Sequence, residues 1–480
     1  MTRKGQTGRA LILALLLAFG RGPVEARVIH ASPAPDAHGD GSPARPVDLA
    51  SAVRLAQRMV TLDAGAGATV QLAPGDYHLA PRDTIEYSCG NCERPDTTVN
   101  LTYGLRVSGR GIRIRGAPDH GSVLHTNAGY GVWFQDCQAC ALEGVVVTGG
   151  ERDTSGIATD GAVVVQRSSV RIEDNWIREN IGDSTTVARH VVGIAGIVGR
   201  EGSRIRILRN EITRCSWDGI ALYRGAEAEI VDNRIDGVDL ALGRRIGGGR
   251  GVGIGCTWDS RAAIRGNLVR RYWKGIGLFV DAEGVIEDNV VNEIATWGLS
   301  LWDAGRGACR GRFRWNVVDS TGACGASIAS TTKGGDPGWF NQNALLRTGQ
   351  NPRYDSGEPY CFQTAIAVHE QPEHFQIEGN LVFQNRTPGD APSSGDLSED
   401  TFRIAAQTIV QRLALHSATR ASGFFRRYSR TPGGERLYDE PSELPDLSRD
   451  PRLPPDLPEP DFGRESPPWS WGQTPGARRR

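Results

Sequence analysis

A short phrase that recurs four times within residues 217–303 constrains the fold more than any other feature of the chain. It reads D-G-I-A-L-Y from Asp218, R-G-V-G-I-G from Arg250, K-G-I-G-L-F from Lys274 and W-G-L-S-L-W from Trp297. A second phrase, such as A-E-I-V-D-N or G-V-I-E-D-N, alternates with it and ends on asparagine. Two β-type phrases in a fixed order within about 25 residues are the signature of a solenoid, in which each repeat is one coil.

The asparagine that ends the second phrase recurs along most of the chain. It stands at Asn175, Asn210, Asn233, Asn267, Asn289, Asn316, Asn343 and Asn380. The intervals run from 22 to 37 residues, so a basic coil of 22 to 27 residues carries loop insertions. Coils stacked about 4.8 Å apart place these asparagines above one another. We therefore predict an internal ladder of hydrogen-bonded side-chain amides, at a point where asparagine tolerates a left-handed turn.

The segments that flank the repeats have other compositions. Residues 1–26 have Arg3 and Lys4 before an apolar run and end in V-E-A, which predicts a signal peptide and a secreted or periplasmic protein. That run is too short to span a membrane, and no later segment is long enough. In residues 27–67, apolar residues at helical spacing over 47–60 predict a short helix that covers the open end of the solenoid.

The solenoid is expected over residues 68–387. Residues 388–430 form an extension in which 401–420 carry a helical apolar stripe, and this helix is predicted to dock on the last coil. The Pro-rich, charged residues 431–480 are predicted to be disordered.

The charge composition bears on the partners. The chain has 55 basic and 56 acidic residues, which leaves no basic excess of the kind that nucleic-acid binding requires. The only lysines are Lys4, Lys274 and Lys333, so Arg is the default cation and an internal Lys274 stands out.

The nine cysteines include two C-x-x-C pairs, Cys89/Cys92 and Cys137/Cys140. This spacing lets two thiolates reach one zinc ion, but an oxidising compartment favours disulfides, which we expect here.

The repeat over residues 68–385 resembles the right-handed parallel β-helix of the pectin lyase-like superfamily, including the repeat shared by carbohydrate-binding proteins and sugar hydrolases. The resemblance implies an all-β, single-stranded right-handed parallel β-helix, and a secreted protein that acts on or binds carbohydrate. The chain lacks the G-H-G motif with paired aspartates of polygalacturonases and the D-P-H-D motif of mannuronan epimerases. The resemblance therefore names no reaction.

Alternation along a strand predicts which residues of the first phrase face outward. The large apolar residues mark the interior, which leaves an outer face of Gly, Ala and Ser. These outward positions are predicted at Gly219, Ala221, Gly251, Gly253, Gly255, Gly275, Gly277, Gly298, Ser300, Gly325, Ser327 and Ala329. A column of glycine indicates close approach by a ligand or by another part of the backbone.

Charged and aromatic residues flank this floor. The strands begin at Asp160, Asp218, Arg250 and Lys274, near Trp217, Trp273 and Trp297, and they end near Tyr223, Arg224, Trp258, Asp259, Asp281, Trp302 and Asp303. Together they predict a shallow groove for an extended polysaccharide, in which aromatic rings stack on sugars and charged groups pair with hydroxyls and uronates. The alternative is a floor that the protein itself covers.

For catalysis we select Asp218, Arg250 and Lys274, aligned in one column with Asp160, and His190 in the turn before the next strand. In a lyase, Lys or Arg takes the proton α to a uronate carboxyl, while Arg or a metal ion held by aspartates, such as Ca²⁺, stabilises the developing charge. In a hydrolase, a pair such as Asp218 with Asp160 or Asp259 with Asp281 flanks the scissile bond. Each Asp is otherwise a turn residue that accepts backbone hydrogen bonds. A non-catalytic glycan-binding or surface structural protein is the alternative function.

Overall fold

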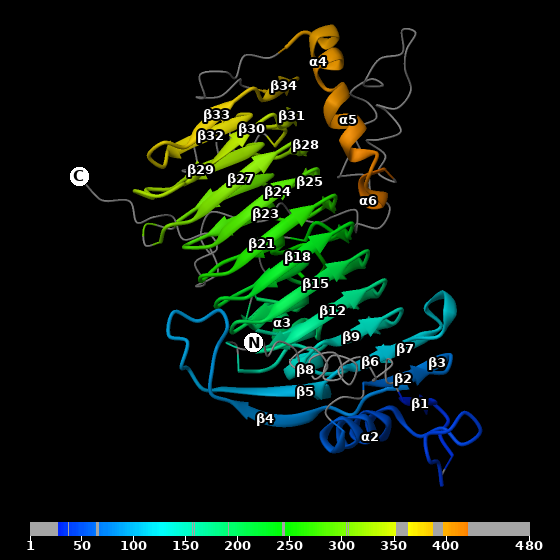
Figure 1. Ribbon diagram of the computed structural model, residues 1–480. Helices are drawn as coiled ribbons and strands as arrows, with labels where there is room; N and C mark the ends of the chain where they lie inside the picture. The colour runs from blue at the N-terminus through cyan, green and yellow to red at the C-terminus, as the bar shows by residue number, and fades with distance from the viewer. Residues whose placement is uncertain are drawn as a thin grey trace, which may run out of the picture.

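Three long parallel sheets, wound as a single-stranded β-helix, make up most of the computed structural model (Figure 1). Each coil contributes one strand to each sheet, as the resemblance implied. The structure describes residues 27–36, 38–63, 67–155, 157, 159–190, 192–241, 245–303, 305, 307–351, 363–386 and 397–420. The predicted signal peptide and the whole of the predicted disordered tail lie outside these residues.

The strands divide among the sheets as follows. The first sheet contains β1 (Arg27–Ala31), β2 (Ala68–Leu72), β6 (Ile112–Arg115), β9 (Cys140–Glu143), β12 (Ser169–Glu173), β15 (Arg204–Leu208), β18 (Glu227–Val231), β21 (Arg261–Arg265), β24 (Glu283–Glu287), β27 (Arg310–Arg314), β30 (Gly338–Asn341) and β33 (Gln376–Glu378). The second contains β3 (Gly75–His78), β7 (Ser122–His125), β10 (Val146–Thr148), β13 (Trp176–Asn180), β16 (Glu211–Cys215), β19 (Arg234–Asp236), β22 (Leu268–Arg270), β25 (Val290–Ile294), β28 (Val317–Thr321), β31 (Ala344–Leu346) and β34 (Leu381–Phe383). The third contains β4 (Arg82–Glu86), β5 (Val99–Arg110), β8 (Tyr130–Gln138), β11 (Gly161–Gln166), β14 (Ala195–Arg200), β17 (Ile220–Leu222), β20 (Val252–Cys256), β23 (Lys274–Phe279), β26 (Leu299–Trp302), β29 (Ala326–Ala329) and β32 (Ile366–Glu370). Within the described strands only β4 and β5 pair antiparallel.

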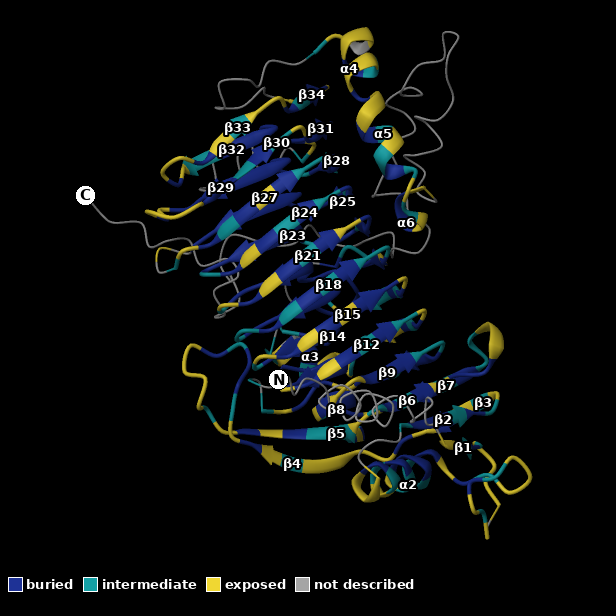
Figure 2. Cartoon of the chain, viewed as in Figure 1, coloured by how far each residue is buried: buried dark blue, intermediate teal, exposed yellow. Residues whose placement is uncertain are grey.

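Burial alternates along the strands of the first sheet, because successive side chains point to opposite faces. β18, with the sequence E-A-E-I-V, alternates between half-buried and buried residues, and β21 and β24 follow the same pattern (Figure 2). The strands of the third sheet differ. β20, β23 and β26 are buried at every position, so the outer face of this sheet is covered as well as the inner one.

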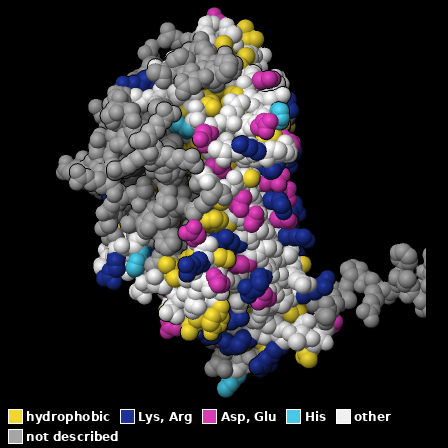
Figure 3. Space-filling model, turned by 90° about the vertical axis from the view of Figure 1, so that its left-hand side faces the viewer, with side chains coloured by type: hydrophobic (Ala, Val, Ile, Leu, Met, Phe, Trp, Pro, Cys, Tyr) yellow, Lys and Arg dark blue, Asp and Glu magenta, His cyan; other side chains and the backbone are white. Residues whose placement is uncertain are grey.

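The outer face of the first sheet carries rows of opposite charges. In one row, Arg204 stands level with Glu227, and the row continues through Arg261 and Glu283. These side chains are largely in water and pair at 3.4 to 3.8 Å. Figure 3 shows basic and acidic side chains interspersed along the length of the molecule. Opposite charges directly across a pair of strands stabilise the pairing.

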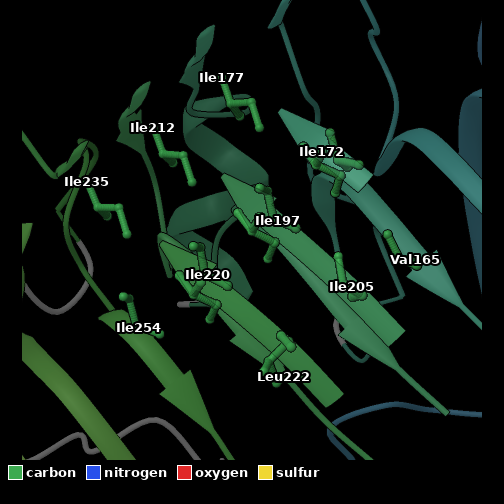
Figure 4. Close-up of a cluster of buried hydrophobic side chains, with 14 of the residues drawn as sticks. Val165, Ile172, Ile177, Ile197, Ile205, Ile212, Ile220, Leu222, Ile235 and Ile254 are labelled. Carbon is green, nitrogen blue, oxygen red and sulfur yellow. The ribbon is translucent and has the colours of Figure 1, made fainter. Parts of the chain in front are cut away.

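Stacked aliphatic side chains fill the space between the three sheets (Figure 4). One layer contains Ile205 from the first sheet, Ile212 from the second and Ile197 from the third, none of them more than 2% exposed. The registers place Ile197 level with Ile220 and then with Ile254, so each row continues into the next coil. A continuous core of this kind is what stacked repeats need, because one coil alone buries too little surface.

The predicted asparagine ladder is confirmed where the first sheet turns into the second. Asn233 Nδ2 donates to Asn267 Oδ1, and Asn267 Nδ2 donates to Asn289 Oδ1, both at 2.9 Å. Asn267 Nδ2 also donates to the carbonyl of Ile230 in the preceding coil. The left-handed residue is not the asparagine but the one before it, such as Asp232 at φ 58°. The ladder therefore satisfies buried polar groups, and the turn is made one residue earlier than predicted.

Helices cover two surfaces of the solenoid. α2 (Leu49–Leu62) packs against the N-terminal coil, and its N-cap Asp48 accepts a hydrogen bond from Ser51 N, which confirms the predicted capping helix. Three short helices, α4 (Glu399–Ala405), α5 (Gln407–Leu413) and α6 (Ser417–Arg420), replace the single helix predicted over 401–420. They run alongside the outer face of the second sheet across several coils (Figure 1). The 3₁₀ turn η1 (Pro118–His120) and α3 (Ser184–His190) lie in connections between strands. None of the described helices is long and apolar enough to cross a membrane.

Candidate functional site

The repeated glycines at the start of the third-sheet strands face the interior. A Cβ on Gly253 would overlap Val269 Cγ1, and one on Gly298 would overlap Val318 Cγ1, both of which are core side chains of the second sheet. Gly219, Gly275 and Gly325 meet Ile235, Val291 and Leu345 in the same way. The prediction that these glycines form an outer floor was wrong, because the chain bends as it enters each strand and the alternation of faces is interrupted there. Glycine is required at the start of each of these strands, because a larger residue would overlap the core side chains of the second sheet.

A narrower column of small residues does face outward. Ala221, Gly255, Gly277, Ser300 and Ser327 stand level with one another in successive coils. All five are buried. A Cβ on Gly277 would overlap the ring of Phe279, and Trp302 Nε1 donates to Ser327 Oγ at 3.1 Å. At these coils the aromatic side chains of the strands themselves lie over the floor, whereas the alternative to an open groove was a cover made of loop insertions or of the C-terminal tail.

Lys274 lies within a cage of aromatic rings above this floor. Its Nζ is 4.3 Å from the ring centroids of both Trp273 and Trp297, and 5.6 Å from those of Phe279 and Trp302. Only 1% of Lys274 is exposed. The negative faces of aromatic rings stabilise a desolvated ammonium group. The aromatic cage therefore allows Lys274 to stay charged although it is buried on the outer face of the third sheet.

Asp218 lies close to Lys274 on the same face. The charge of Lys274 acts on the Asp218 carboxyl, and the strand register places Lys274 level with Val252 of the preceding coil. Asp218 is fully buried, and its Oδ1 accepts a hydrogen bond from Val252 N at 2.6 Å. Burial raises the pKa of Asp218 to about 7, against the opposing effects of the Val252 N–H, the Lys274 charge and the Tyr223 hydroxyl. A carboxyl group with such a pKa can give or take a proton near neutral pH.

The other predicted catalytic residues do not stand in one column with this pair. Arg250 is 1% exposed, its Cζ lies 5.7 Å from the Trp217 ring centroid, and desolvation lowers its pKa. His190 ends α3, where burial and the charge of Arg152 lower its pKa. His190 therefore belongs to the surroundings of Asp160, which precedes β11, four coils before the strand β23 that begins at Lys274.

Asp160 takes part in an internal network. Its Oδ2 pairs with Arg152 Nη1 and accepts a hydrogen bond from Asp153 N, and both side chains of the ion pair are fully buried. Asp153 accepts hydrogen bonds from Thr102 N and Oγ1. Burial, then the nearby charge of Asp160, raises the pKa of Asp153 to about 8. Arg152 and Asp153 were absent from the sequence prediction, since nothing distinguishes them from ordinary loop residues.

At the other end of the strands, predicted groove residues hold a loop. Arg224 donates to the carbonyls of Gly90 and Cys92 and stacks over Trp258, whose Nε1 donates to Asn91 Oδ1 at 3.2 Å. The Cys89–Cys92 disulfide closes this loop, which confirms a disulfide for that pair. Cys137 and Cys140, by contrast, are free, buried thiols that donate to backbone carbonyls, so the disulfide expected there is not formed.

The predicted aspartates at the strand ends accept backbone hydrogen bonds in turns. Asp281 Oδ1 accepts from Asp259 N at 2.7 Å, and burial raises the pKa of Asp281. Asp303 Oδ1 accepts from Gly305 N, and its Oδ2 accepts from Thr331. Among the described residues, no three His, Cys, Asp or Glu side chains converge as a metal site would require.

A second buried network was not foreseen. Arg200, at the end of β14, donates to Glu86 Oε1 and Tyr130 Oη at 2.7 Å and to Thr159 Oγ1 at 2.6 Å. Glu86 lies 114 residues earlier in the chain, so no local pattern connects it to Arg200. This network ties β4 to the outer face of the third sheet.

Several hydrogen-bond donors on this face have no partner among the described residues. They are Trp217 Nε1, Trp273 Nε1, Trp297 Nε1 and Ser300 Oγ. Buried polar groups in folded proteins are nearly always paired, so a set of unsatisfied groups on one face requires an explanation. Indole donors beside aromatic faces, a cation and a titratable carboxyl group are the elements with which proteins bind sugars.

Two overlapping sections of the sequence, residues 98–239 and 190–336, match the family described as right handed beta helix region. No curated protein matches the sequence significantly. Among solved structures, the pectate lyase Pel9A is 12% identical with a TM-score of 0.43, over 87% of this chain and 90% of that one. An exopolygalacturonase from Thermotoga maritima is 11% identical with a TM-score of 0.39, over 79% and 95% of the two chains. A tailspike mutant of E. coli bacteriophage HK620, in complex with a pentasaccharide, is 12% identical with a TM-score of 0.42, over 77% and 64%.

Similarities at this level of identity do not bear on the activity of the chain. The family match agrees with the three parallel sheets and with the continuous core between them. The chain is a right-handed parallel β-helix protein, as its match to the family described as right handed beta helix region and its three parallel sheets show.

Proposed function

We propose that the protein binds an extended, uronate-containing glycan on the outer face of the third sheet and cleaves it by β-elimination. The observation that supports this most directly is the buried Asp218, with its pKa raised to about 7, beside Lys274 in its aromatic cage. The signal peptide predicted from the sequence agrees with an extracellular polysaccharide substrate.

The charges on this face suit elimination better than hydrolysis. A hydrolase needs two carboxyl groups about 5 to 9.5 Å apart across the scissile bond. Asp160, the partner that the sequence offered for Asp218, is paired with Arg152. Asp218 then lies near the cation Lys274, whose charge acts on its carboxyl group, and Arg250 packs against the ring of the neighbouring Trp217. Elimination from a uronate needs one proton acceptor and positive charge near the carboxylate, and these three residues supply both.

We assign proton transfer to Asp218 rather than to Lys274, which was the base predicted from the sequence. The aromatic cage favours the charged ammonium, and an ammonium group does not accept a proton. Asp218 takes the proton α to the uronate carboxyl, and the electron pair left on that carbon forms the ring double bond as the glycosidic C–O bond breaks. The leaving oxygen then takes up a proton. Lys274 and Arg250 stabilise the negative charge that builds up on the carboxylate.

Access to these groups requires a change in the structure, since Asp218, Arg250 and Lys274 are each at most 1% exposed. The proposal therefore includes an opening of this face before a glycan binds. The same burial favours the second candidate, a non-catalytic surface or glycan-binding β-helix in which the charged groups only stabilise the covered face.

A polysaccharide panel tests the proposal. The full chain is incubated with pectate, alginate, glucuronan and a neutral xylan, and products are followed by the ultraviolet absorbance of unsaturated ends and by reducing-end assay. We expect unsaturated ends from at least one uronate polymer, at a rate that rises with pH through about 7, because Asp218 must be ionised to accept the proton. Reducing ends without unsaturation would indicate a hydrolase, and no product at all would favour the non-catalytic candidate.

Variants of the two central residues sharpen this test. Asp218→Asn is expected to lower the rate by about 10²- to 10⁴-fold, the usual contribution of a general acid or base. Lys274→Met retains the length of the side chain within the cage but removes its charge, and it is expected to reduce the rate strongly too. Arg206→Met, in an exposed ion pair on the first sheet, is the control and should leave the rate unchanged. Equal rates for all three variants would disprove the assignment.

A further inference from the structure

Asp218 and Tyr223 flank β17, one before it and one after it, and both are buried on the outer face of the third sheet. β17 is only three residues long, and its outward residue, Ala221, packs in one cluster with Trp217 and Tyr223. Trp217, the neighbour of Asp218, and Tyr223 also line one small cavity, so the two ends of β17 come together there. The Tyr223 hydroxyl is close enough to the Asp218 carboxyl to act on it as a hydrogen-bond donor, which lowers the pKa of Asp218.

These two side chains have complementary proton chemistry. Burial, then the nearby charge of Asp218, raises the pKa of Tyr223 well above its usual range, so its hydroxyl keeps its proton at neutral pH. Asp218 Oδ1 accepts from Val252 N at 2.6 Å, whereas Asp218 Oδ2 has no hydrogen-bond partner among the described residues. This second oxygen is therefore the one that can take up a proton. A proton donor and a proton acceptor lie side by side on this face.

We propose that Tyr223 gives the proton to the leaving oxygen, and that its position beside Asp218 selects uronates whose α proton and leaving oxygen lie on the same face of the sugar ring. The inference rests on the proposed function and deepens it, because it identifies the source of the second proton and the class of uronate.

The reaction then returns both side chains to their starting states. Asp218 removes the α proton, the electron pair of that C–H bond forms the ring double bond, and the C–O bond breaks with its electron pair on the leaving oxygen. Tyr223 gives its proton to that oxygen and becomes a phenolate. Asp218 passes the proton that it took to the neighbouring phenolate, which restores a carboxylate and a tyrosine. The products are an unsaturated uronide and a new hydroxyl group, and no water is consumed.

The restriction on the substrate follows from the position of the two groups. Because Asp218 and Tyr223 are neighbours, they approach a bound sugar from one side. In glucuronate and mannuronate the α proton and the leaving oxygen lie on the same face of the ring, whereas in galacturonate and guluronate they lie on opposite faces. An adjacent acceptor and donor are correctly oriented for the first class only. We therefore expect cleavage of glucuronan or polymannuronate rather than of pectate or polyguluronate.

These four polymers, incubated with the full chain, provide the first test, which follows the ultraviolet absorbance of unsaturated ends. The second test uses Tyr223→Phe, which removes only the hydroxyl group. Tyr272→Phe is the matched control. Tyr272 is also fully buried, and its hydroxyl group has no partner in the described part of the chain, but the ring belongs to the core between the sheets.

A second substrate separates proton donation from a structural role. It is a uronide of the same configuration as the polymer that is cleaved, with nitrophenolate as the leaving group, which departs without a proton because it is a weak base. Tyr223→Phe should lower the rate on the polymer by about 10²- to 10⁴-fold, the usual contribution of a general acid. It should leave the rate on the nitrophenyl substrate nearly unchanged, which also shows that the variant is folded. Tyr272→Phe should retain both rates.

The outcomes separate this inference from the proposed function. Unsaturated ends from pectate or polyguluronate alone would place the acceptor and the donor on opposite sides of the sugar, so the inference would fail while elimination stands. If Tyr223→Phe slows both substrates equally, or slows neither, Tyr223 is not the proton donor. If the natural chain produces unsaturated ends from none of the polymers, the proposed function fails and the role of Tyr223 fails with it.

Discussion

The outer faces of the first and third sheets use charged residues in opposite ways. On the first sheet, Arg206 and Glu229 pair at 2.8 Å with side chains 58% and 44% exposed. On the third, Arg152 and Asp160 pair with no exposed side-chain surface. Exposed pairs cost little to form and contribute little, whereas burying two charges costs several kcal/mol per ion before their attraction offsets it. Charged side chains therefore have little effect on stability on the first sheet, whereas their burial on the third sheet carries a large free-energy penalty. The third sheet is therefore where we look for function.

The largest effect that separates the faces is expected from Arg152→Met. Removal of the guanidinium leaves Asp160 and Asp153 as buried carboxyl groups without their cation, and it also removes the hydrogen bond from Arg152 Nε to the Val192 carbonyl. Breaking a buried pair from one side typically costs about 3 to 5 kcal/mol. Urea denaturation at pH 8 measures the free energy of unfolding.

The pH dependence of this loss provides a check. The loss should shrink as the pH falls, because the protonated forms of both carboxyl groups tolerate burial without a cation. A loss under about 1 kcal/mol at pH 8 would mean that water enters this part of the third sheet, and the contrast between the faces would then be much smaller than the burial indicates.

The next largest effect concerns Asp218 and pH. An unfolded Asp releases its proton near pH 3.8, but the folded chain retains the Asp218 proton up to about pH 7. The folded state therefore binds more protons in this interval, and its stability falls as the pH rises from about 4 to 7. Asp218→Asn removes this titration, so the variant should gain about 2 to 3 kcal/mol relative to the natural chain between pH 5 and pH 8.

Urea midpoints at several pH values measure this difference. If the difference between the two proteins stays constant with pH, Asp218 is ionised throughout, and both its raised pKa and its role in proton transfer are disproved.

A smaller effect is expected where the small-residue column meets the cage. Gly277→Ala places a methyl group where the Phe279 ring lies, so this ring, whose centroid is 5.6 Å from Lys274 Nζ, must move. Overpacking of this kind costs about 1 to 3 kcal/mol. Ser300→Ala, at the level position in the next coil, adds no atoms and is the control, expected to stay within about 0.5 kcal/mol. Similar losses for both variants would show that Gly277 is not required to make room for the cage.

The sequence predicted the fold better than it predicted which side chains point inward and which point outward. Three examples show why. Asn267 was recognised because asparagine recurs at the same place in one coil after another. Gly253 was assigned to the wrong face because alternation assumes a straight strand, and the bend that turns this glycine inward is set by contact with Val269 in another sheet. Arg200 and Glu86 escaped notice because their contact joins residues that no repeat relates.

The site was predicted in part, for a similar reason. Lys274 was selected because lysine is rare in this chain, and Trp273, Trp297 and Trp302 were placed near the strand ends. Their convergence on one ammonium group depends on side-chain directions in two adjacent coils, which spacing does not encode. The burial of the whole face depends on covering segments whose lengths vary from coil to coil, so it was not predictable from the repeat.

The smallest expected effect is that of Arg206→Met, which removes an exposed charge on the first sheet, in contrast to the buried charge that Arg152→Met removes. The substitution is the same as in Arg152→Met, and methionine retains much of the apolar stem, so the two variants differ mainly in the burial of the charge that is lost. For the exposed Arg206–Glu229 pair we expect a change in the free energy of unfolding of no more than about 0.5 kcal/mol. Added salt should reduce even this, since it screens exposed charges. A loss above about 2 kcal/mol would show that the charged rows of the first sheet act cooperatively along the solenoid, and burial would no longer explain the difference between the two faces.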